Sequence, residues 1–428
     1  MSFVPLCGHN DWVEQALDRV EKLYVGSHGV LVTTLDSNAQ IIDEEPLIAD
    51  FGDVLPFMNR FGRGAFVKAQ IEAARPFLSS GLYQSNGRIR LFSNHDWLLG
   101  LLELFRATEE QPFLDKAADG ARTLIGSFFV GGLLIDENVS WRHPKSWLCA
   151  ASPFNGGYIE LWNELHGETG DRIFLESAKA LAAGWIGTPG FRQHGIFART
   201  LCAYSRLLDR ALRPAARMKA RLFKDNTNLV WGLLDLYAAT GDDRWRAAIE
   251  KWLSGFEAHF FNDGMVFLWL DNKLCGQDAT LRAAFSTIDL LCDLAAGGIV
   301  ADRALGLAER IAHRWVETQW ENGLFPENSG CEFDHLDSNV DMAIALMKLA
   351  GMTGQEKYAV AARRAAQGVI THHQRQNGFV LAVTKEGGVS DGRIIVKYQA
   401  LLLKLAIAPD DPQALICDRD LLYFLRDR

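Results

Sequence analysis

Gly100-Leu-Leu-Glu-Leu-Phe-Arg-Ala-Thr108 and Gly232-Leu-Leu-Asp-Leu-Tyr-Ala-Ala-Thr240 are two copies of one pattern. In both copies the apolar residues recur at the three- and four-residue spacing of a helix rather than alternating as in a strand. Weaker copies run from Tyr158 to Gly170, from Thr287 to Gly298 and from Val340 to Gly354, and divergent copies at 52–62 and 395–409 lie towards the two ends. The pattern predicts a mainly helical protein built from repeated units.

A second phrase, a polar residue or glycine followed by glycine and apolar residues, separates the helical stretches. Successive copies are 45 to 69 residues apart, and their glycines are Gly29, Gly87, Gly132, Gly195, Gly264, Gly323 and Gly378. Glycine commonly ends a helix in the left-handed conformation, and the apolar residues after it suit a short strand. The period is larger than that of the common solenoid repeats. Each unit is therefore expected to contain a helix, a tight turn, a second helix, a glycine turn, a short strand and a long loop.

Counting these units predicts seven first helices and six second helices. The first helices are expected near 52–61, 95–107, 156–168, 228–240, 284–297, 339–352 and 395–407, and the second near 64–79, 112–129, 171–187, 242–260, 300–318 and 355–373. The N-terminal helix 11–25 is left over and can serve as the outer partner of helix 395–407. An open superhelix would need polar caps at both ends. We therefore expect an all-α fold, a closed (α/α) toroid of seven helical hairpins, or six if one short terminal helix takes no part, with short β-hairpins and long loops on one rim.

Composition agrees with one soluble body. The 428 residues contain no Pro-, Ser- or Gly-rich linker, so we expect a single domain over 1–428. A net charge of −9 without a basic stripe argues against nucleic acid and anionic membranes as partners. Seven cysteines without a CxxC motif, and an N-terminus that lacks a signal-peptide pattern, favour a cytoplasmic location. The oligomeric state stays open.

The long connections predict where function lies. Connections from a first to a second helix span a few residues, whereas those from a second helix to the next first helix run roughly 15 to 40 residues, and loops longer than about 12–15 residues are usually functional. In a ring, these long loops emerge on one rim, at the N-terminal ends of the inner helices. That rim is the expected site.

The rim segments are rich in groups that bind sugars. Aromatic faces stack on the C–H faces of pyranose rings, and polar groups pair with hydroxyls. The expected substrate-binding residues are Trp97, His95, Trp141, His143, Arg192, His194, Trp269, Arg282, His335, Arg393 and Tyr398. The cations Arg142, Arg192, Arg199, Arg282, Arg393 and Lys397 would suit an acidic sugar, because arginine binds a carboxylate through two hydrogen bonds.

Four asparagines favour a structural interpretation instead. Asn94, Asn155, Asn226 and Asn339 occupy one equivalent position directly before an inner helix, where we expect them to act as N-caps. Asp96, two residues after the first of them, suits the first helical turn through the helix dipole.

Acidic residues concentrate in the stretch from Glu327 to Asp341. Five acids and one histidine lie within fifteen residues, and mutual repulsion could raise the pKa of one carboxyl group, although a solvated acidic loop explains the stretch equally well. Carboxylates that precede other inner helices could face this stretch across the ring. The candidate catalytic residues are Asp334, Glu332, Asp337, Asp50, Asp53 and Asp225.

At this point the chain resembles the six-hairpin glycosidase group, whose (α/α) barrels include glucoamylase-like and unsaturated-glucuronyl hydrolases, N-acyl-glucosamine 2-epimerase-like isomerases and several polysaccharide lyases. The resemblance rests on the hairpin phrasing, the glycine turns and the rim rich in Trp, Asp and His, and it covers most of the chain. It implies a toroid and a carbohydrate substrate. No catalytic signature of a particular family is matched, so no family residue is carried over.

The expected function is that of a carbohydrate-active enzyme, a glycoside hydrolase that acts on an oligosaccharide or an acidic sugar through acid/base carboxylates. One alternative is a sugar epimerase or isomerase that uses rim histidines. Another is a non-catalytic toroid that binds a peptide or protein, which predicts a rim without a close carboxyl pair. We expect no cofactor and no metal, because Cys331 and His335 lack a second nearby thiol.

Overall fold

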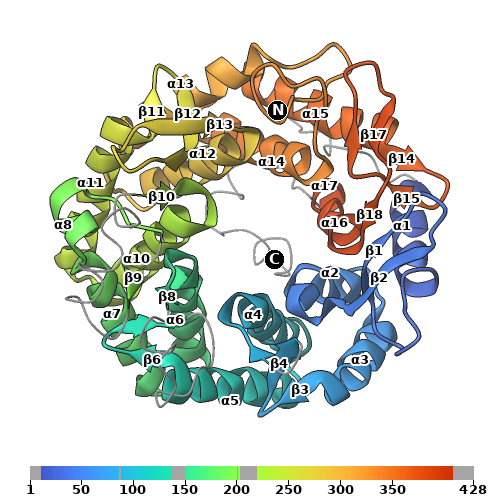
Figure 1. Ribbon diagram of the computed structural model, residues 1–428, viewed down its shortest axis with the longest axis horizontal. Helices are drawn as coiled ribbons and strands as arrows, with labels where there is room; N and C mark the ends of the chain where they lie inside the picture. Colours follow the sequence, from blue (N-terminus) through green and yellow to red (C-terminus); the bar gives the residue numbers. More distant parts are fainter. Residues whose placement is uncertain (1–10, 86–87, 136–149, 200, 203–218, 408–428) are drawn as a thin grey trace.

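The computed structural model describes residues 11–85, 88–135, 150–199, 201–202 and 219–407. Within them the helices form a ring of two concentric layers (Figure 1). The inner layer contains α2 (Leu55–Arg60), α4 (Leu91–Thr108), α6 (Gly157–Thr169), α10 (Thr227–Thr240), α12 (Leu281–Ala296), α14 (Leu336–Thr353) and α16 (Val396–Leu401). The outer layer contains α1 (Asp11–Lys22), α3 (Gly64–Ala73), α5 (Gln111–Phe128), α7 (Arg172–Ile186), α11 (Asp243–His259), α13 (Ala301–Val316) and α15 (Glu356–His373). The expected (α/α) toroid is confirmed.

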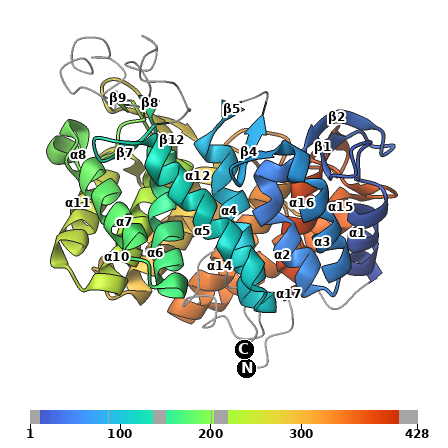
Figure 2. The same cartoon turned by 90° about the horizontal axis from the view of Figure 1, so that it is seen from below.

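Short strands and irregular helices occupy one rim of the ring (Figure 2). The strands are β1 (Val32–Leu35), β2 (Ile41–Pro46), β3 (Leu78–Ser79), β4 (Leu82–Ser85), β5 (Arg88–Ile89), β6 (Phe129–Val130), β7 (Leu133–Leu134), β8 (Ala150–Ala151), β9 (Leu201–Cys202), β10 (Ala220–Arg221), β11 (Phe261–Asn262), β12 (Met265–Leu270), β13 (Gly276–Ala279), β14 (Gln374–Arg375), β15 (Gly378–Phe379), β16 (Ala382–Val383), β17 (Val389–Asp391) and β18 (Ile394–Ile395). Among the described residues all strand pairs are antiparallel, and the largest sheet, β10-β12-β11 with β13 on β12, has four strands. Further short helices are η1 (Leu47–Asp53), η2 (Arg75–Phe77), η4 (Pro153–Gly156), α8 (Pro189–His194), η5 (Leu222–Asn226) and α17 (Lys404–Ile407).

The first and last described segments of the chain close the ring. Helix α1 packs against α16, so α1 is the outer partner of this inner helix, as the sequence predicts. The Tyr24 hydroxyl donates to the Asn377 carbonyl oxygen at 2.6 Å, and the Trp12 ring meets the edge of Phe379. Strand β1 pairs with β18 through Thr34 and Ile395. Apolar packing, a hydrogen bond and strand pairing therefore all join the ends.

The asparagines expected as N-caps have another role. None of the helices they precede or enter has a side-chain cap from them; instead, the amide of Asn226 accepts from the Phe197 N–H at 3.0 Å and donates to the Phe197 carbonyl at 3.0 Å. Asn339 makes the same pair of bonds with Phe325, and Asn94 makes it with Tyr83. Each amide satisfies the backbone N–H and carbonyl of one buried residue, Tyr83 in β4 or Phe197 and Phe325 in segments outside the strands. The capping prediction is wrong for Asn94, Asn226 and Asn339, because the N–H of the contacted residue needs an acceptor and its carbonyl needs a donor, and each side-chain amide supplies both.

Two glycine turns show why the repeat requires glycine. Gly195 (φ 71°) and Gly323 (φ 90°) have left-handed backbones, and a Cβ on either would run into a carbonyl oxygen of the adjacent outer helix, that of Lys251 or of Arg364. Each turn thus packs directly on the next hairpin. The turn predicted around Gly87 lies outside the described residues, and Gly81 (φ 80°) makes the turn between β3 and β4.

The core lies between the two helical layers. It contains Trp162, Trp185, Trp245, Trp252 and Trp315, all almost completely buried. Among the described residues, no helix is both long and apolar enough to cross a membrane.

Candidate functional site

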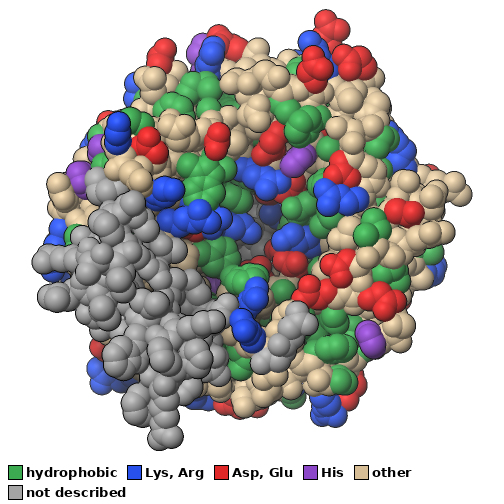
Figure 3. All heavy atoms as spheres, in the orientation of Figure 1, with side chains coloured by type: hydrophobic (Ala, Val, Ile, Leu, Met, Phe, Trp, Pro, Cys, Tyr) green, Lys and Arg blue, Asp and Glu red, His purple; other side chains and the backbone are tan. Residues whose placement is uncertain are grey.

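A cavity opens in the middle of the ring, where charged side chains gather around a hollow (Figure 3). Residues from η1 and from the inner helices α4, α6, α10, α12, α14 and α16 line it, mostly from their N-terminal halves. Its ionisable lining residues are Asp53, His95, Asp96, Glu160, Lys224, Arg282, Asp289, Asp337, Asp341, Lys348, Lys397, Tyr398 and Lys404. The cavity therefore collects ionisable side chains from all around the ring.

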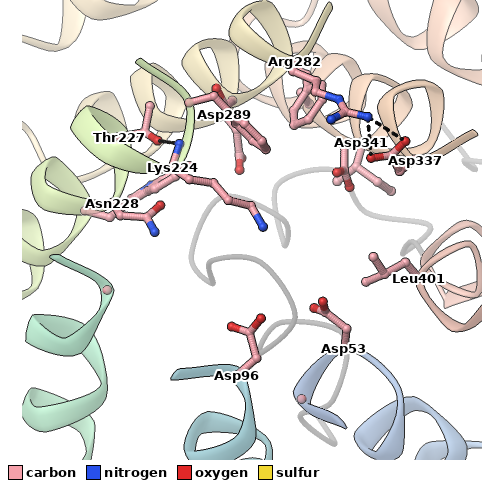
Figure 4. A pocket seen from close by; sticks show the side chains of 18 of the residues that line it. Asp53, Asp96, Lys224, Thr227, Asn228, Arg282, Asp289, Asp337, Asp341 and Leu401 are labelled. Carbon is pink, nitrogen blue, oxygen red and sulfur yellow. Dashed lines mark hydrogen bonds and ion pairs between the residues drawn. The ribbon is translucent and has the colours of Figure 1, made fainter. Parts of the chain in front are cut away.

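Asp53 and Asp96 form a close carboxyl pair on one wall (Figure 4). With Asp50 they form a group in which one oxygen of each carboxylate lies within 4.8 Å of the others. The approach of η1 to α4 makes this pair possible: a Cβ on Gly100 would lie 2.6 Å from the Gly52 Cα, and a Cβ on Gly52 would meet the Asp96 carbonyl. Two glycines thus let the two backbones touch where the carboxylates meet.

The two carboxyl groups have opposite pKa shifts. Burial raises the pKa of Asp53 to about 7, and the charge of Asp96 adds to the effect. Burial also acts to raise the pKa of Asp96, but the hydrogen bond and charge of His95 outweigh it and lower that pKa. Near neutral pH, Asp53 is therefore able to hold a proton while Asp96 is ionised.

His95 supports Asp96. Its Nδ1 lies 2.8 Å from the Asp96 Oδ1, and its ring meets Tyr158 edge to face. Burial works against the charged imidazole, but the hydrogen bond and charge of Asp96 raise the pKa of His95. Gly157 leaves room for the ring, since a Cβ there would be 2.7 Å from Nε2. The imidazolium and Asp96 thus stabilise each other.

A second group of ionisable side chains lies on the opposite wall. The Arg282 guanidinium is 3.3 Å from Asp337 and 3.4 Å from Glu327 and bonds the Nδ1 of His335 at 3.0 Å. Burial raises the pKa of Glu327 to about 7, although Arg282 opposes the shift. Burial and the Arg282 charge lower the pKa of His335, which favours its neutral form. Tyr398 lines the cavity beside Asp337.

A buried ion cluster joins three inner helices. The Lys348 ammonium on α14 lies 2.6 Å from both Asp289 and Asp293 on α12, and Trp231 on α10 donates to Asp293 at 2.8 Å. Burial raises the pKa of Asp293 to about 7, against the effect of Lys348. The cluster fixes the spacing of helices that form the cavity wall.

The candidate carboxylates are divided by the ring. Asp53 and Asp337 line the cavity, and Asp50 lies beside Asp53 with its carboxylate 2.9 Å from the Lys397 ammonium. Asp334 is fully buried outside the lining, where His373 Nε2 lies 2.7 Å from it and the Val383 N–H donates to it at 2.9 Å. Glu332 is exposed and also outside the lining.

Asp225 is buried next to the cavity rather than in its lining. It forms an ion pair with Arg221, and burial raises its pKa to about 6 against the Arg221 charge. It is not part of the group that Asp50, Asp53 and Asp96 form.

The expected sugar-binding residues are also dispersed. His95, Arg282 and Tyr398 line the cavity and His335 contacts Arg282, whereas Trp97 is in the core and donates to the Gly81 carbonyl. The others lie on the rim or the outer face: Arg192 is exposed, His194 packs against His259, Arg393 pairs with Asp391, and Trp269 packs beneath the guanidinium of Arg199. Trp141 and His143 lie outside the described residues.

Sequence reasoning missed several cavity residues. Asp96 is not among the candidate catalytic residues, and Lys224, Asp289, Lys348 and Lys404 are not among the expected site residues. Asp96 carried a detectable signal, its place beside His95 before an inner helix. The other residues lie at positions where only the ring geometry reveals the lumen-facing side.

The three carboxylates Asp50, Asp53 and Asp96 have a spacing that would admit a cation. The Lys397 ammonium lies 2.9 Å from Asp50 and 3.8 Å from Asp53 and balances part of their charge. Because such acidic groups are common in proteins without a metal ion, the spacing alone does not assign a metal site here.

Comparisons with known proteins agree on the fold. No protein-family model matches the chain, and no curated protein matches its sequence. Among solved structures, it is similar to an α-1,2-mannosidase from Trichoderma reesei (TM-score 0.67, 14% identity, 95% of this chain and 93% of that chain). It is also similar to the cellobiose 2-epimerase of Bacillus thermoamylovorans (TM-score 0.57, 13% identity, 93% and 99%) and to an unsaturated glucuronyl hydrolase from a Bacillus species (TM-score 0.53, 13% identity, 84% and 96%).

These neighbours are carbohydrate-active enzymes of two kinds, glycoside hydrolases and epimerases. The resemblance to the six-hairpin glycosidase group is thereby confirmed at the level of fold. At this identity the likeness extends to the fold alone, and reaction and substrate have to be argued from the site.

Proposed function

We propose that the protein is a carbohydrate-active enzyme, and more specifically a glycoside hydrolase in which Asp53 is the proton donor and Asp96 the ionised carboxylate. The observation that carries the proposal is the Asp53–Asp96 pair, two carboxyl groups in a central cavity with opposite pKa shifts. Pairs whose environments separate their pKa values in this way supply an acid and a base at one pH.

We propose a retaining reaction for this pair, because its two carboxyl groups are close enough for one of them to act as the nucleophile. Retaining glycosidases hold their two carboxyl groups about 5–5.5 Å apart, whereas inverting enzymes leave about 6.5–9.5 Å for a water molecule. The closest oxygens of Asp53 and Asp96 lie within 4.8 Å. In the proposed first step Asp96 attacks the anomeric carbon while Asp53 protonates the departing glycosidic oxygen. Water then attacks the glycosyl–Asp96 ester as Asp53 takes up a proton, which releases the sugar and regenerates both groups.

The test uses a panel of aryl glycosides and oligosaccharides, with release of reducing ends as the readout. Asp53→Asn and Asp96→Asn should each lower kcat by about 10²–10⁴-fold, the usual contribution of a positioned acid or base. Glu386→Gln, an exposed rim carboxylate, is the matched control and should keep wild-type turnover. NMR of the first-formed sugar should show the anomeric configuration of the substrate. Full activity of both asparagine variants, with loss of activity in Glu332→Gln, would reject the assignment.

A sugar epimerase is the second candidate, and the His95–Asp96 contact is the observation that favours it. Such a dyad can transfer a proton next to a carbonyl. An epimerase would invert the configuration of one carbon of a reducing sugar without creating new reducing ends. His95→Gln would then abolish turnover. A non-catalytic toroid receives less support, because it predicts a rim without a close carboxyl pair.

A further inference from the structure

Lys224 is the cavity cation whose charge is left without a carboxylate partner. Its neighbours in the lining are paired: Lys348 with Asp289, Lys397 with Asp50, Lys404 with Asp341 and Arg282 with Asp337. Within the described part of the chain, no carboxylate lies at ion-pair distance from the Lys224 ammonium. The Lys224 ammonium lies over the ring of its neighbour Phe223, 5.7 Å from the ring centroid.

The backbone directs Lys224 into the lumen. Lys224 has a left-handed conformation (φ 63°, ψ −22°), which is unfavourable for a residue with a Cβ. Two contacts hold this turn in place: the Lys224 N–H donates to the Thr227 hydroxyl at 3.1 Å, and Phe223 meets the edge of Phe285. The side chain extends into the open space between the walls, towards the side that carries Asp53 and Asp96 (Figure 4).

An unpaired ammonium in a partly enclosed cavity attracts an anion. Charge-assisted hydrogen bonds are stronger than neutral ones, and a neutral sugar hydroxyl balances no charge. The other lining cations have carboxylates at ion-pair distance, whereas the Lys224 charge acts on Asp53 and Asp96 only from farther away, where it lowers the pKa of both. Lys224 therefore gains more than the paired cations from an acidic ligand.

We propose that Lys224 is a specificity-determining residue that binds a negatively charged group on the sugar, so that the cavity selects an anionic sugar over its neutral parent. This inference rests on the proposed carbohydrate-binding function of the cavity. A uronate carboxylate and a sugar phosphate offer the same charged oxygens, and the experiment distinguishes them.

The test measures binding without turnover, by ligand-observed NMR. The probes are glucose, galactose and mannose, each compared with its uronate and its 6-phosphate. The wild-type protein should bind the uronate or the phosphate of one sugar about 10–100-fold more tightly than the neutral parent, as expected for a charge-assisted hydrogen bond. Lys224→Met should remove this preference and leave neutral-sugar affinity unchanged, and Lys224→Arg should retain most of it. Lys273→Met, an exposed lysine on the β12–β13 loop, is the control.

Three outcomes separate this inference from the proposed function. Equal binding of charged and neutral sugars, or a preference that survives in Lys224→Met, overturns the role of Lys224 and leaves hydrolysis untouched. A Lys224-dependent preference without hydrolysis of any glycoside supports the inference and rejects the hydrolase. If glycosides are cleaved, Lys224→Met should raise KM for the acidic substrate more than for the neutral one. The pH dependence of kcat is measured for both substrates. If Lys224→Met shifts it equally for the acidic and the neutral substrate and changes no KM ratio, Lys224 acts only on the charges of Asp53 and Asp96, and the proposed role is overturned.

Discussion

At the Asp53–Asp96 pair, burial and hydrogen bonding drive two chemically identical groups in opposite directions. Asp53 pays the full cost of desolvation next to another negative charge, whereas Asp96 has an imidazole to offset that cost. The charges of Lys397 and Lys224 lower the pKa of both groups, so the largest difference between them is the hydrogen bond and charge that His95 supplies to Asp96. A residue's type therefore gives less information about its protonation than the groups within hydrogen-bonding distance.

The raised pKa of Asp53 predicts a pH-dependent stability. Because the folded state keeps the proton up to about pH 7 and the unfolded state releases it near pH 4, this contribution is fully present below about pH 4 and is lost as the pH rises through 7. A shift of about three units corresponds to about 4 kcal/mol, and with 23% of the side chain exposed we expect about 1–3 kcal/mol. Asp53→Asn should therefore raise the melting temperature more at pH 8 than at pH 5.

Thermal unfolding of wild type and Asp53→Asn at both pH values checks this difference in melting temperature. Asp302→Asn, an exposed carboxylate on α13, should show little difference, and a gain for Asp53→Asn that is equal at both pH values would contradict the prediction.

At the scale of elements, the contact between η1 and α4 positions the candidate site. Gly52 and Gly100 let the two backbones approach to a distance that no side chain would allow. The consequence is a close meeting, in the central cavity, of two carboxylates from segments about forty residues apart in sequence. The site is therefore made by packing between elements rather than by a local motif.

Gly100→Ala should disturb both stability and activity. Its Cβ would lie 2.6 Å from the Gly52 Cα, and overpacking of this kind typically costs about 1–3 kcal/mol. A displacement of about 1 Å between reacting groups lowers turnover by roughly 10²-fold. The melting temperature, measured by thermal unfolding, and kcat should both fall.

The control for this substitution is Gly126→Ala in α5. A Cβ there has no atom within 4 Å, so better helix propensity should stabilise the protein by about 0.5–1 kcal/mol. If Gly100→Ala behaves like Gly126→Ala, the close approach of η1 and α4 is unimportant for the site.

The sequence predicted the helices well and the contacts between them poorly. The pairing of inner and outer helices followed from apolar spacing, because each helix buries one face. The first turn of α4 was missed: the predicted start at residue 95 assumed that Asn94 caps the helix, whereas α4 begins at Leu91 and Asn94 bonds Tyr83. Asp334 is one of the carboxylates that the sequence offers as a catalytic acid, but His373, 39 residues away, contacts it in the core. Such partners depend on how distant segments meet, which periodicity does not encode.

For the whole molecule, closure of the ring predicts a strong effect at one tryptophan. Trp12 on α1 is 3% exposed and packs on Phe379, close to the other end of the ring. Trp12→Ala should cost about 3–5 kcal/mol, the usual range for a buried tryptophan. Urea unfolding measures the loss. Leu23→Ala, at a residue that is 43% exposed, should change stability by less than about 0.5 kcal/mol. Equal effects of the two substitutions would mean that the junction contributes little.

The junction between α1 and α16 also governs the order of events during synthesis. Helix α1 leaves the ribosome well before α16, since the partner of Tyr24 at Asn377 follows 353 residues later. The apolar face of α1, with Trp12, Val13 and Leu17, stays uncovered throughout that interval. Contacts between such distant residues form slowly, because the intervening chain must first be brought together. Helix α1 therefore finds its partner late in folding, and a chain that stops short of α16 leaves the apolar face of α1 exposed to chaperones and proteases.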